Sequence, residues 1–115
     1  MAQLYYIHGN TSQTDHFTPK MSLGFAESEL IGVRFYTDEG RTSRVYPTLG
    51  SITYLQTADE DKIDLRTVDA GTVQLVDLTA PDVRMPNAYG AALYGKLSFS
   101  GVTPGLYFEA IVWRN

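Results

Sequence analysis

The sequence predicts an all-β protein: an antiparallel β-sandwich, with jelly-roll or another Greek-key topology and roughly eight to nine short strands. Apolar and polar side chains alternate with a period of two along much of the 115-residue chain, as in strands that bury one face. Turn residues recur at intervals of roughly ten residues, which is typical of sandwiches and barrels. Two long connections, residues 10–20 and 79–91, favour crossings between sheets over a simple meander.

The expected strands are short β-rich runs bounded by turn signals. They are residues 4–7, 21–25, 30–37, 43–46, 51–56, 62–67, 72–78, 93–99 and 106–113. The run 30–37 is well marked, because Ile31, Val33 and Phe35 fall on one face. The run 106–113 is the most hydrophobic. The length of the chain suits a single sandwich domain over residues 1–115.

The connections between these runs also have sequence signals. Residues 38–40, Asp-Glu-Gly, predict a turn in which Gly40 supplies a positive φ. Residues 59–61, Asp-Glu-Asp, are interpreted as a solvated hairpin tip, and residues 69–71 as a tight connection. The one candidate helix, residues 26–29, is too short to be significant.

Composition excludes several classes of function. The chain has nine basic residues, scattered along its length, and thirteen acidic residues, which gives a formal net charge of −4. We therefore expect no nucleic-acid partner. No stretch reaches the ~20 apolar residues of a membrane span, and the first residues lack the features of a signal peptide, so we expect no membrane partner. The absence of cysteine excludes disulfides, thiolate metal sites and thiol nucleophiles.

Few residues are candidates for chemistry. His8 and His16 belong to no motif with a nucleophile or further metal ligands, and each is interpreted as a surface or strand-end histidine. The run 59–61 lacks the alternate spacing and the glycine of a calcium loop. Acids such as Asp64 leave paired-carboxylate glycosidase chemistry open as an alternative. We expect no enzyme activity, no catalytic residue, no cofactor and no metal.

Arginines and tyrosines on turns and connections are the candidates for contact with a partner. Arginine binds carbonyls and carboxylates through a planar fork, and tyrosine combines apolar area with a polar tip. The predicted partner-binding residues are Arg41, Arg44, Tyr46, Arg84 and Tyr89. Two alternatives stay open, namely that the arginines only increase solubility and that the tyrosines cap the ends of the sandwich.

The closing segment resembles the final hairpin of small tailed-phage virion proteins. Residues 93–105 read LYGKLSFSGVTPG and residues 108–112 read FEAIV, which gives a strand, a Phe-Ser-Gly-Val-Thr turn and a last strand. Residues 69–73, DAGTV, and the pair Pro86-Asn87 fit the same style. In that family the domain is a β-sandwich, often a jelly roll, that decorates or cements the capsid shell. The resemblance is confined to the C-terminal half of the chain and transfers no individual functional residue.

The resemblance implies a virion structural protein, made in the host cytoplasm and located on the capsid surface. It implies the major capsid protein as partner, with dimers or trimers of the chain on a symmetric lattice. Contacts are then expected from residues 9–20, 38–42 and 79–91 and from strand edges. The alternative is a carbohydrate- or receptor-binding module, such as a tail-fibre or spike domain, which the many tyrosines and the acidic loops would suit.

Overall fold

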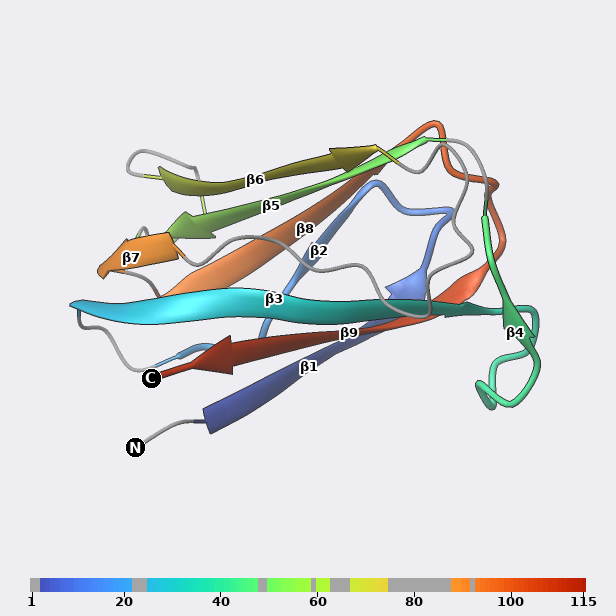
Figure 1. Ribbon diagram of the computed structural model, residues 1–115, viewed down its shortest axis with the longest axis horizontal. Helices are drawn as coiled ribbons and strands as arrows, with labels where there is room; N and C mark the ends of the chain where they lie inside the picture. The colour runs from blue at the N-terminus through green and yellow to red at the C-terminus, as the bar shows by residue number, and fades with distance from the viewer. Residues whose placement is uncertain are drawn as a thin grey trace.

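A computed structural model describes residues 3–21, 25–47, 50–58, 60–62, 67–74, 88–91 and 93–115 of the chain. Within these residues every regular element is a β-strand (Figure 1). The strands are β1 (Gln3–Asn10), β2 (Asp15–Phe17), β3 (Phe25–Tyr36), β4 (Arg44–Val45), β5 (Ser51–Thr57), β6 (Thr67–Gln74), β7 (Ala88–Ala91), β8 (Tyr94–Ser100) and β9 (Tyr107–Arg114). The predicted all-β class is confirmed.

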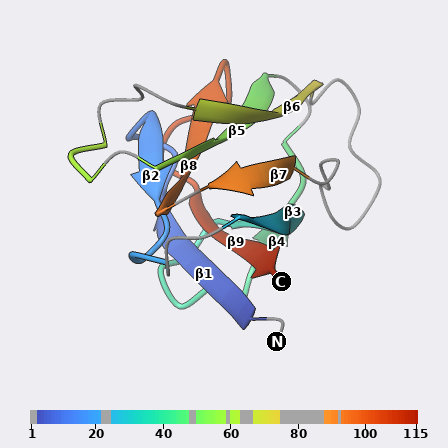
Figure 2. The same cartoon turned by 90° about the vertical axis from the view of Figure 1, so that its left-hand side faces the viewer.

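The strands form two antiparallel sheets that lie face to face (Figures 1 and 2). Sheet A has the order β1-β9-β3, and two short strands share the remaining edge of β3. There β7 pairs with Phe25–Ser28 and β4 pairs with Phe35 and Tyr36. Sheet B has the order β2-β8-β5-β6. The predicted antiparallel sandwich is confirmed.

The chain passes repeatedly from one sheet to the other. Only the β3–β4 and β5–β6 connections stay within a sheet among the described strands, whereas every other pair of successive strands is divided between sheets A and B. The β8 and β9 strands, which close the chain, therefore lie in opposite layers, where each is flanked by strands distant in sequence, so the expected closing hairpin is wrong. This placement puts β9 in the interior of sheet A, between β1 and β3.

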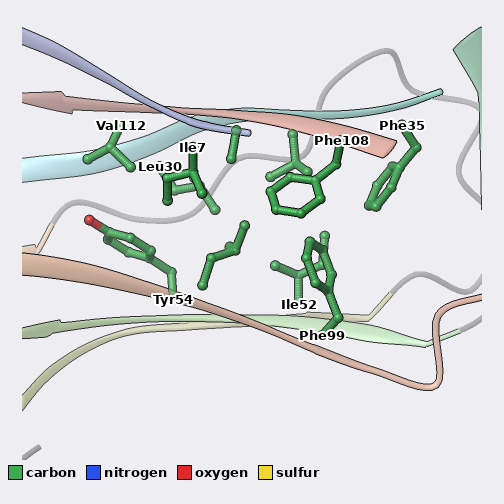
Figure 3. Close-up of a cluster of buried hydrophobic side chains, with 11 residues drawn as sticks. Ile7, Leu30, Phe35, Ile52, Tyr54, Phe99, Phe108 and Val112 are labelled. Carbon is green, nitrogen blue, oxygen red and sulfur yellow. The ribbon is translucent and has the colours of Figure 1, made fainter. Parts of the chain in front are cut away.

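Side chains from both sheets fill the space between them (Figure 3). The ring centroid of Phe99 lies 5.9 Å from that of Phe35 and 4.8 Å from that of Phe108, and both pairs meet edge to face, which is a preferred arrangement of aromatic rings. The buried cluster consists of Ile7, Leu30, Val33, Phe35, Ile52, Tyr54, Leu97, Phe99, Phe108, Ala110 and Val112. The period-two pattern of β1, β5, β8 and β9 supplies most of these residues. In β3 a register shift between Leu30 and Gly32 interrupts the alternation, so Leu30, and not the predicted Ile31, joins Val33 and Phe35 in the core.

Polar groups enter the core at the end away from the phenylalanines, where Figure 3 shows the Tyr54 hydroxyl. Burial raises the pKa of this phenol above its ordinary value. The nearby Gln56 side chain is fully buried and donates its amide to the Ser28 hydroxyl. Among the described residues, neither the Tyr54 hydroxyl nor Oε1 of Gln56 has a hydrogen-bond partner. As far as the described residues show, these two buried polar atoms at this end of the core are uncompensated.

Two expectations about the first third of the chain are wrong. The predicted loop 10–20 contains β2, which pairs with β8 over three residues, too few to show a periodicity in sequence. The candidate helix 26–29 lies inside β3, where pairing with β7 and β9 overrides the helix propensity of Ala and Glu. A long central strand thus replaces a shorter strand and a helical turn.

Three further expectations are corrected. Residues 69–71 are part of β6, where a register shift opposite Tyr54 and Leu55 absorbs the irregularity as a β-bulge. Residues 88–91, expected within an irregular connection, form β7. The positive φ predicted for Gly40 falls instead on Arg41, whose φ is 56°.

The other expected strands compare directly with the structure. Runs 4–7, 30–37, 43–46, 51–56, 93–99 and 106–113 correspond to β1, β3, β4, β5, β8 and β9. Parts of the remaining predictions lie outside the described residues, namely 22–24, 63–66, 75–78 and 79–87.

Candidate functional site

The last strand buries one row of side chains and turns the other away from the core. Buried and half-buried residues alternate without interruption along β9. The outward row is Tyr107, Glu109, Ile111 and Trp113. Because three of these four residues are aromatic or aliphatic, β9 is apolar on both faces. A strand with one face in solvent usually has polar residues on that face.

The register of the neighbouring strands extends this row into a patch. Leu4 and Tyr6 of β1 lie opposite Trp113 and Ile111. On the other side of β9, Tyr36 of β3 lies opposite Tyr107. Directly opposed side chains of this kind contact each other on the surface of a sheet. We call this patch the outer face of sheet A; it consists of Leu4, Tyr6, Tyr36, Tyr107, Ile111 and Trp113.

Two of these side chains are unusually accessible. Leu4 is 44% exposed and Tyr6 is 47% exposed, and both belong to β1. Among the described residues, Tyr46 at 49% is the other large hydrophobic side chain that is exposed to this degree. Burying apolar area of this size in an interface is favourable by about 25 cal/mol per Å² before the costs of association.

A polar row crosses the outer face of sheet A. Nε2 of His8 lies 2.7 Å from Oε2 of Glu109, its cross-strand neighbour. Arg34 of β3 lies opposite Glu109 on the other side. The ring of Tyr6 also lies near that of His8, with centroids 6.4 Å apart. Hydrogen-bonding groups within an apolar patch give a bound surface a defined orientation.

The outside of sheet B has a different chemistry. Its outward positions on β5 and β8 include Ser51, Thr53, Ser98 and Ser100, and the next outward position of β5 is Leu55, opposite Lys96. At one end, Nζ of Lys62 lies 5.0 Å from the ring centroid of Phe17 and 4.6 Å from that of Tyr94, so an ammonium covers both rings. The sandwich therefore has one polar side and one aromatic side, and the aromatic side is the candidate binding surface.

Arg41, predicted as a contact residue, has its guanidinium bonded within the chain. Its Nε donates to the carbonyl of Phe108 at 2.9 Å, Nη1 to that of Glu39 at 3.0 Å, and Nη2 to that of Gly9 at 3.3 Å. The guanidinium carbon lies 5.9 Å from the ring centroid of Tyr107. Arg41 thus ties the β3–β4 turn to β1 and β9 at one end of the outer face of sheet A.

The carboxylate of Asp38 accepts hydrogen bonds within the same turn. Oδ1 of Asp38 accepts from the backbone N–H of Ser43 at 2.8 Å, and Oδ2 accepts from the Thr42 hydroxyl at 2.6 Å. These hydrogen bonds, that to Thr42 foremost, hold the pKa of the Asp38 carboxyl below its usual value. The backbone N–H of Thr37 closes the turn on the carbonyl of Ser43 at 3.0 Å. The turn is therefore a defined structural element beside the aromatic patch.

The other predicted contact residues are distributed as follows. The guanidinium carbon of Arg44 lies 5.0 Å from the ring centroid of Tyr46, so the structure brings these two together. Tyr89 is in β7, opposite Glu27. Arg84 lies outside the described residues. Across the β3–β4 pair, Arg44 lies opposite Tyr36, so Arg44 and the Tyr46 ring that it covers border the outer face of sheet A.

The two histidines differ in environment. His8 is exposed, as expected, whereas the interpretation of His16 as a surface or strand-end residue is wrong. The ring of His16 is buried between the sheets, 5.8 Å from the ring centroid of Phe99, and its Nε2 pairs with the carbonyl of Gln13 at 3.0 Å. An apolar pocket between aromatic rings accepts an imidazole when one nitrogen is hydrogen-bonded.

The described residues lack two kinds of feature. In the ranges given above, His, Asp and Glu side chains form no group of three or more suited to hold a metal ion. No helix long and apolar enough to span a membrane occurs in the same part of the chain.

The aromatic patch was not among the predicted contact residues. The signal for it is in the sequence, because residues 107–113 are apolar in both phases of the alternation and residues 4–7 are apolar without interruption. A strand buried on one face needs only one apolar phase, so a second one indicates a second covered face. Sequence alone does not show that these two runs are neighbours.

Comparisons with protein-family models, with curated proteins and with solved structures gave no match to this chain.

Proposed function

We propose that this protein is a non-catalytic binding protein that docks onto a larger assembly through the outer face of sheet A. The observation that carries the proposal is the exposure of Leu4 and Tyr6 beside Ile111 and Trp113 on one side of the sandwich. Contiguous exposed apolar residues on a soluble protein typically mark an interaction surface, and Trp and Tyr are the residue types that contribute most to such interfaces.

The strand order supports a more specific proposal. Sheet A reads β1-β9-β3-β7 and faces β2-β8-β5-β6. We infer that this is a jelly roll, the double Greek key in which eight strands wind between two sheets, with β4 as an addition to the β3–β5 connection. Jelly rolls recur in viral capsid proteins and in lectins. The architecture therefore suits both of the functions expected from the sequence.

Of these two, we propose a virion decoration or cement protein that binds the major capsid protein on the capsid surface. The resemblance in sequence of residues 93–112 to the closing segment of such proteins favours this choice, and it concerns the sequence alone, because β8 and β9 do not pair as a hairpin. A broad patch suits a shell, because many moderate contacts repeated over a lattice stabilise it without any single strong site.

Co-sedimentation with capsid shells tests the proposal. The shells are assembled from the major capsid protein encoded in the same genome. Wild-type protein should pellet with them, and Trp113→Thr should bind about tenfold or more weakly, since aromatic anchors dominate interfaces. Leu55→Thr is the control, because it removes a half-buried apolar side chain from the outside of sheet B and should bind normally. Failure of the wild type to bind, or equal binding by Trp113→Thr, would contradict the proposal.

A carbohydrate-binding role is the second candidate, and one observation favours it. The guanidinium of Arg44 lies over one side of the Tyr46 ring, and the ring is 49% exposed, an arrangement that suits stacking on a sugar. A glycan array tests this role. Binding of a glycan that Tyr46→Ser abolishes and Trp113→Thr leaves intact would favour the second candidate over the first.

A further inference from the structure

One edge of sheet A is long, regular and without a partner strand in the described part of the chain. The β1 strand pairs with β9 over all residues from Gln3 to Asn10, with no shift of register. No described strand pairs with its other edge. Figure 2 shows β1 at the margin of the sandwich.

The hydrogen-bond pattern shows which backbone groups point toward that edge. The N–H of Thr11 donates to the carbonyl of Leu106 at 2.8 Å, in the same register as the β1–β9 pair. Because hydrogen-bonded pairs alternate along an antiparallel ladder, the odd-numbered residues of β1 bond to β9. The N–H and C=O groups of Leu4, Tyr6 and His8 therefore point outward.

The pairing of β3 gives the same result independently. The N–H of Thr37 donates to the carbonyl of Ser43. The backbone groups of Phe35 and Thr37 therefore point toward β4, and those of Tyr36 point toward β9. Tyr107, opposite Tyr36, then bonds to β3, and Phe108 bonds to Gly9 of β1. Both routes leave the even-numbered residues of β1 with outward backbone groups.

The usable stretch of this edge is symmetric about one residue. At its C-terminal end, the carbonyl of Asn10 already accepts from the N–H of Gln13 at 3.1 Å, so the chain turns away there. The outward groups that remain belong to Leu4, Tyr6 and His8, and Tyr6 is the middle one. A second copy of the same stretch, turned by a two-fold rotation, presents donors and acceptors in a complementary order.

The other edges of the sheets carry features that hinder pairing with another chain, and β1 does not. The edge strands β2, β4 and β7 have three, two and four residues. The edge strand β6 is longer but carries the bulge opposite Tyr54. Short strands and bulges are the usual protection of edges, as are lysine and proline. Residues 3–10 contain no lysine, no proline and no carboxylate.

We propose that two copies of this chain pair antiparallel along β1, with the two-fold axis beside Tyr6. Leu4 of each copy then lies beside His8 of the other, and the two Tyr6 rings are neighbours. With three residues per copy, each contributing one donor and one acceptor, the pair forms about six backbone hydrogen bonds. Sheet A becomes continuous through the dimer, and its outer face doubles in extent and remains accessible. The inference does not depend on what that face binds.

The expected affinity is moderate. Two five-residue stretches bury less area than the interface of a typical stable complex, so we expect a reversible dimer with a Kd of about micromolar order. Sedimentation velocity over a concentration series measures it. A wild-type protein that stays monomeric at a concentration about a hundredfold above this Kd would overturn the proposal.

Proline tests the backbone pairing. Tyr6→Pro removes an N–H that points toward the outer edge and none that bonds to β9, so the fold should persist while dimerisation weakens about tenfold or more. Tyr6→Thr is the control, because it removes the ring and keeps the N–H, and it should retain more of the dimer than Tyr6→Pro. Equal dimerisation of wild type and Tyr6→Pro would exclude pairing along β1.

Cross-linking tests the register and does not depend on the proline variant. The chain has no cysteine, so single substitutions report without background. Directly opposed residues bring their Cα atoms within disulfide range, and on mild oxidation Tyr6→Cys should form covalent dimers at least about tenfold faster than Leu4→Cys. Leu4→Cys mixed with His8→Cys should cross-link as the heterodimer. Equal rates for the two single variants would overturn the proposed axis.

Discussion

The imidazole of His16 packs edge-on against the ring of Phe108, with 4.6 Å between the ring centroids. This contact joins β2 of sheet B to β9 of sheet A, and it exists because Gly9 of β1 has no side chain. A Cβ atom at Gly9 would fall 2.6 Å from Nδ1 of His16 and 2.9 Å from the ring of Phe108. The edge strand β1 thus closes tightly over two rings of the core.

Gly9→Ala should therefore destabilise the protein. The added methyl group overlaps two packed rings, and overpacking of a core costs about 1–3 kcal/mol. Urea denaturation measures the change. Gly40→Ala is the control, because its Cβ would meet the nearest atom, Oδ2 of Asp38, only at 3.4 Å, and its stability should change by less than about 0.5 kcal/mol. Equal stability of Gly9→Ala and wild type would show that His16 is not packed against β1.

Tyr54→Phe should be neutral or stabilise the fold by about 1 kcal/mol. The Tyr54 hydroxyl is buried with no partner among the described residues, so its removal relieves a desolvation penalty and keeps the ring. Tyr54→Leu, which also removes the ring, should destabilise. Thermal denaturation of the three proteins compares them, and a clear loss of stability in Tyr54→Phe would indicate an internal water or another partner for the hydroxyl.

Arg41 should be replaceable by glycine at a smaller cost than by alanine. Both variants lose the hydrogen bonds to Phe108, Glu39 and Gly9, but the backbone of Arg41 has a φ of 56°, which glycine adopts without strain. The two variants should differ by about 0.5–1 kcal/mol in unfolding free energy. An alanine variant as stable as the glycine variant would mean that the turn rearranges on loss of the guanidinium.

The Asp38 carboxylate predicts a pH dependence. Its pKa in the folded state lies below the ordinary value of 3.8, because the Thr42 hydroxyl and the Ser43 N–H bond to the charged form. Its contribution to stability is therefore present above the unfolded pKa and is lost as the pH falls through the folded pKa.

Asp38→Asn isolates this contribution. Between about pH 5 and pH 2 the wild type should lose more stability than Asp38→Asn, so that the two curves converge at low pH. Chemical denaturation across this range measures the difference, and a direct NMR titration of the Asp38 carboxyl gives the folded pKa. A titration midpoint above 3.8 would contradict the hydrogen-bonded turn.

Strands with a strong two-residue alternation were predictable from the sequence, and those held by distant partners were not. The outward and inward rows of β8 and β9 follow the sequence pattern directly. By contrast, β2 has three residues, and only its pairing with β8 defines it. Residues 69–71 look like a turn because they contain Gly71, yet a bulge keeps them inside β6.

The candidate site shows the same limit. Tyr6 and Ile111 are each readable as apolar residues in strands, but they are 105 positions apart, and their contact follows from the position of β9 beside β1. Likewise, the position of Arg41 beside a predicted turn indicates an accessible contact residue. Its Nε nevertheless donates to the carbonyl of Phe108, on another strand. Residue types were predictable; their neighbours depend on the order of strands in the sheet.

A cryo-EM map of capsid shells saturated with this protein, at a resolution that distinguishes the two sheets, shows which side of the sandwich contacts the shell. We expect bound sandwiches that turn Trp113, Ile111 and the rest of their aromatic side toward the shell. A map in which that side points to solvent, with the serine- and threonine-rich side of sheet B on the shell, would contradict this expectation.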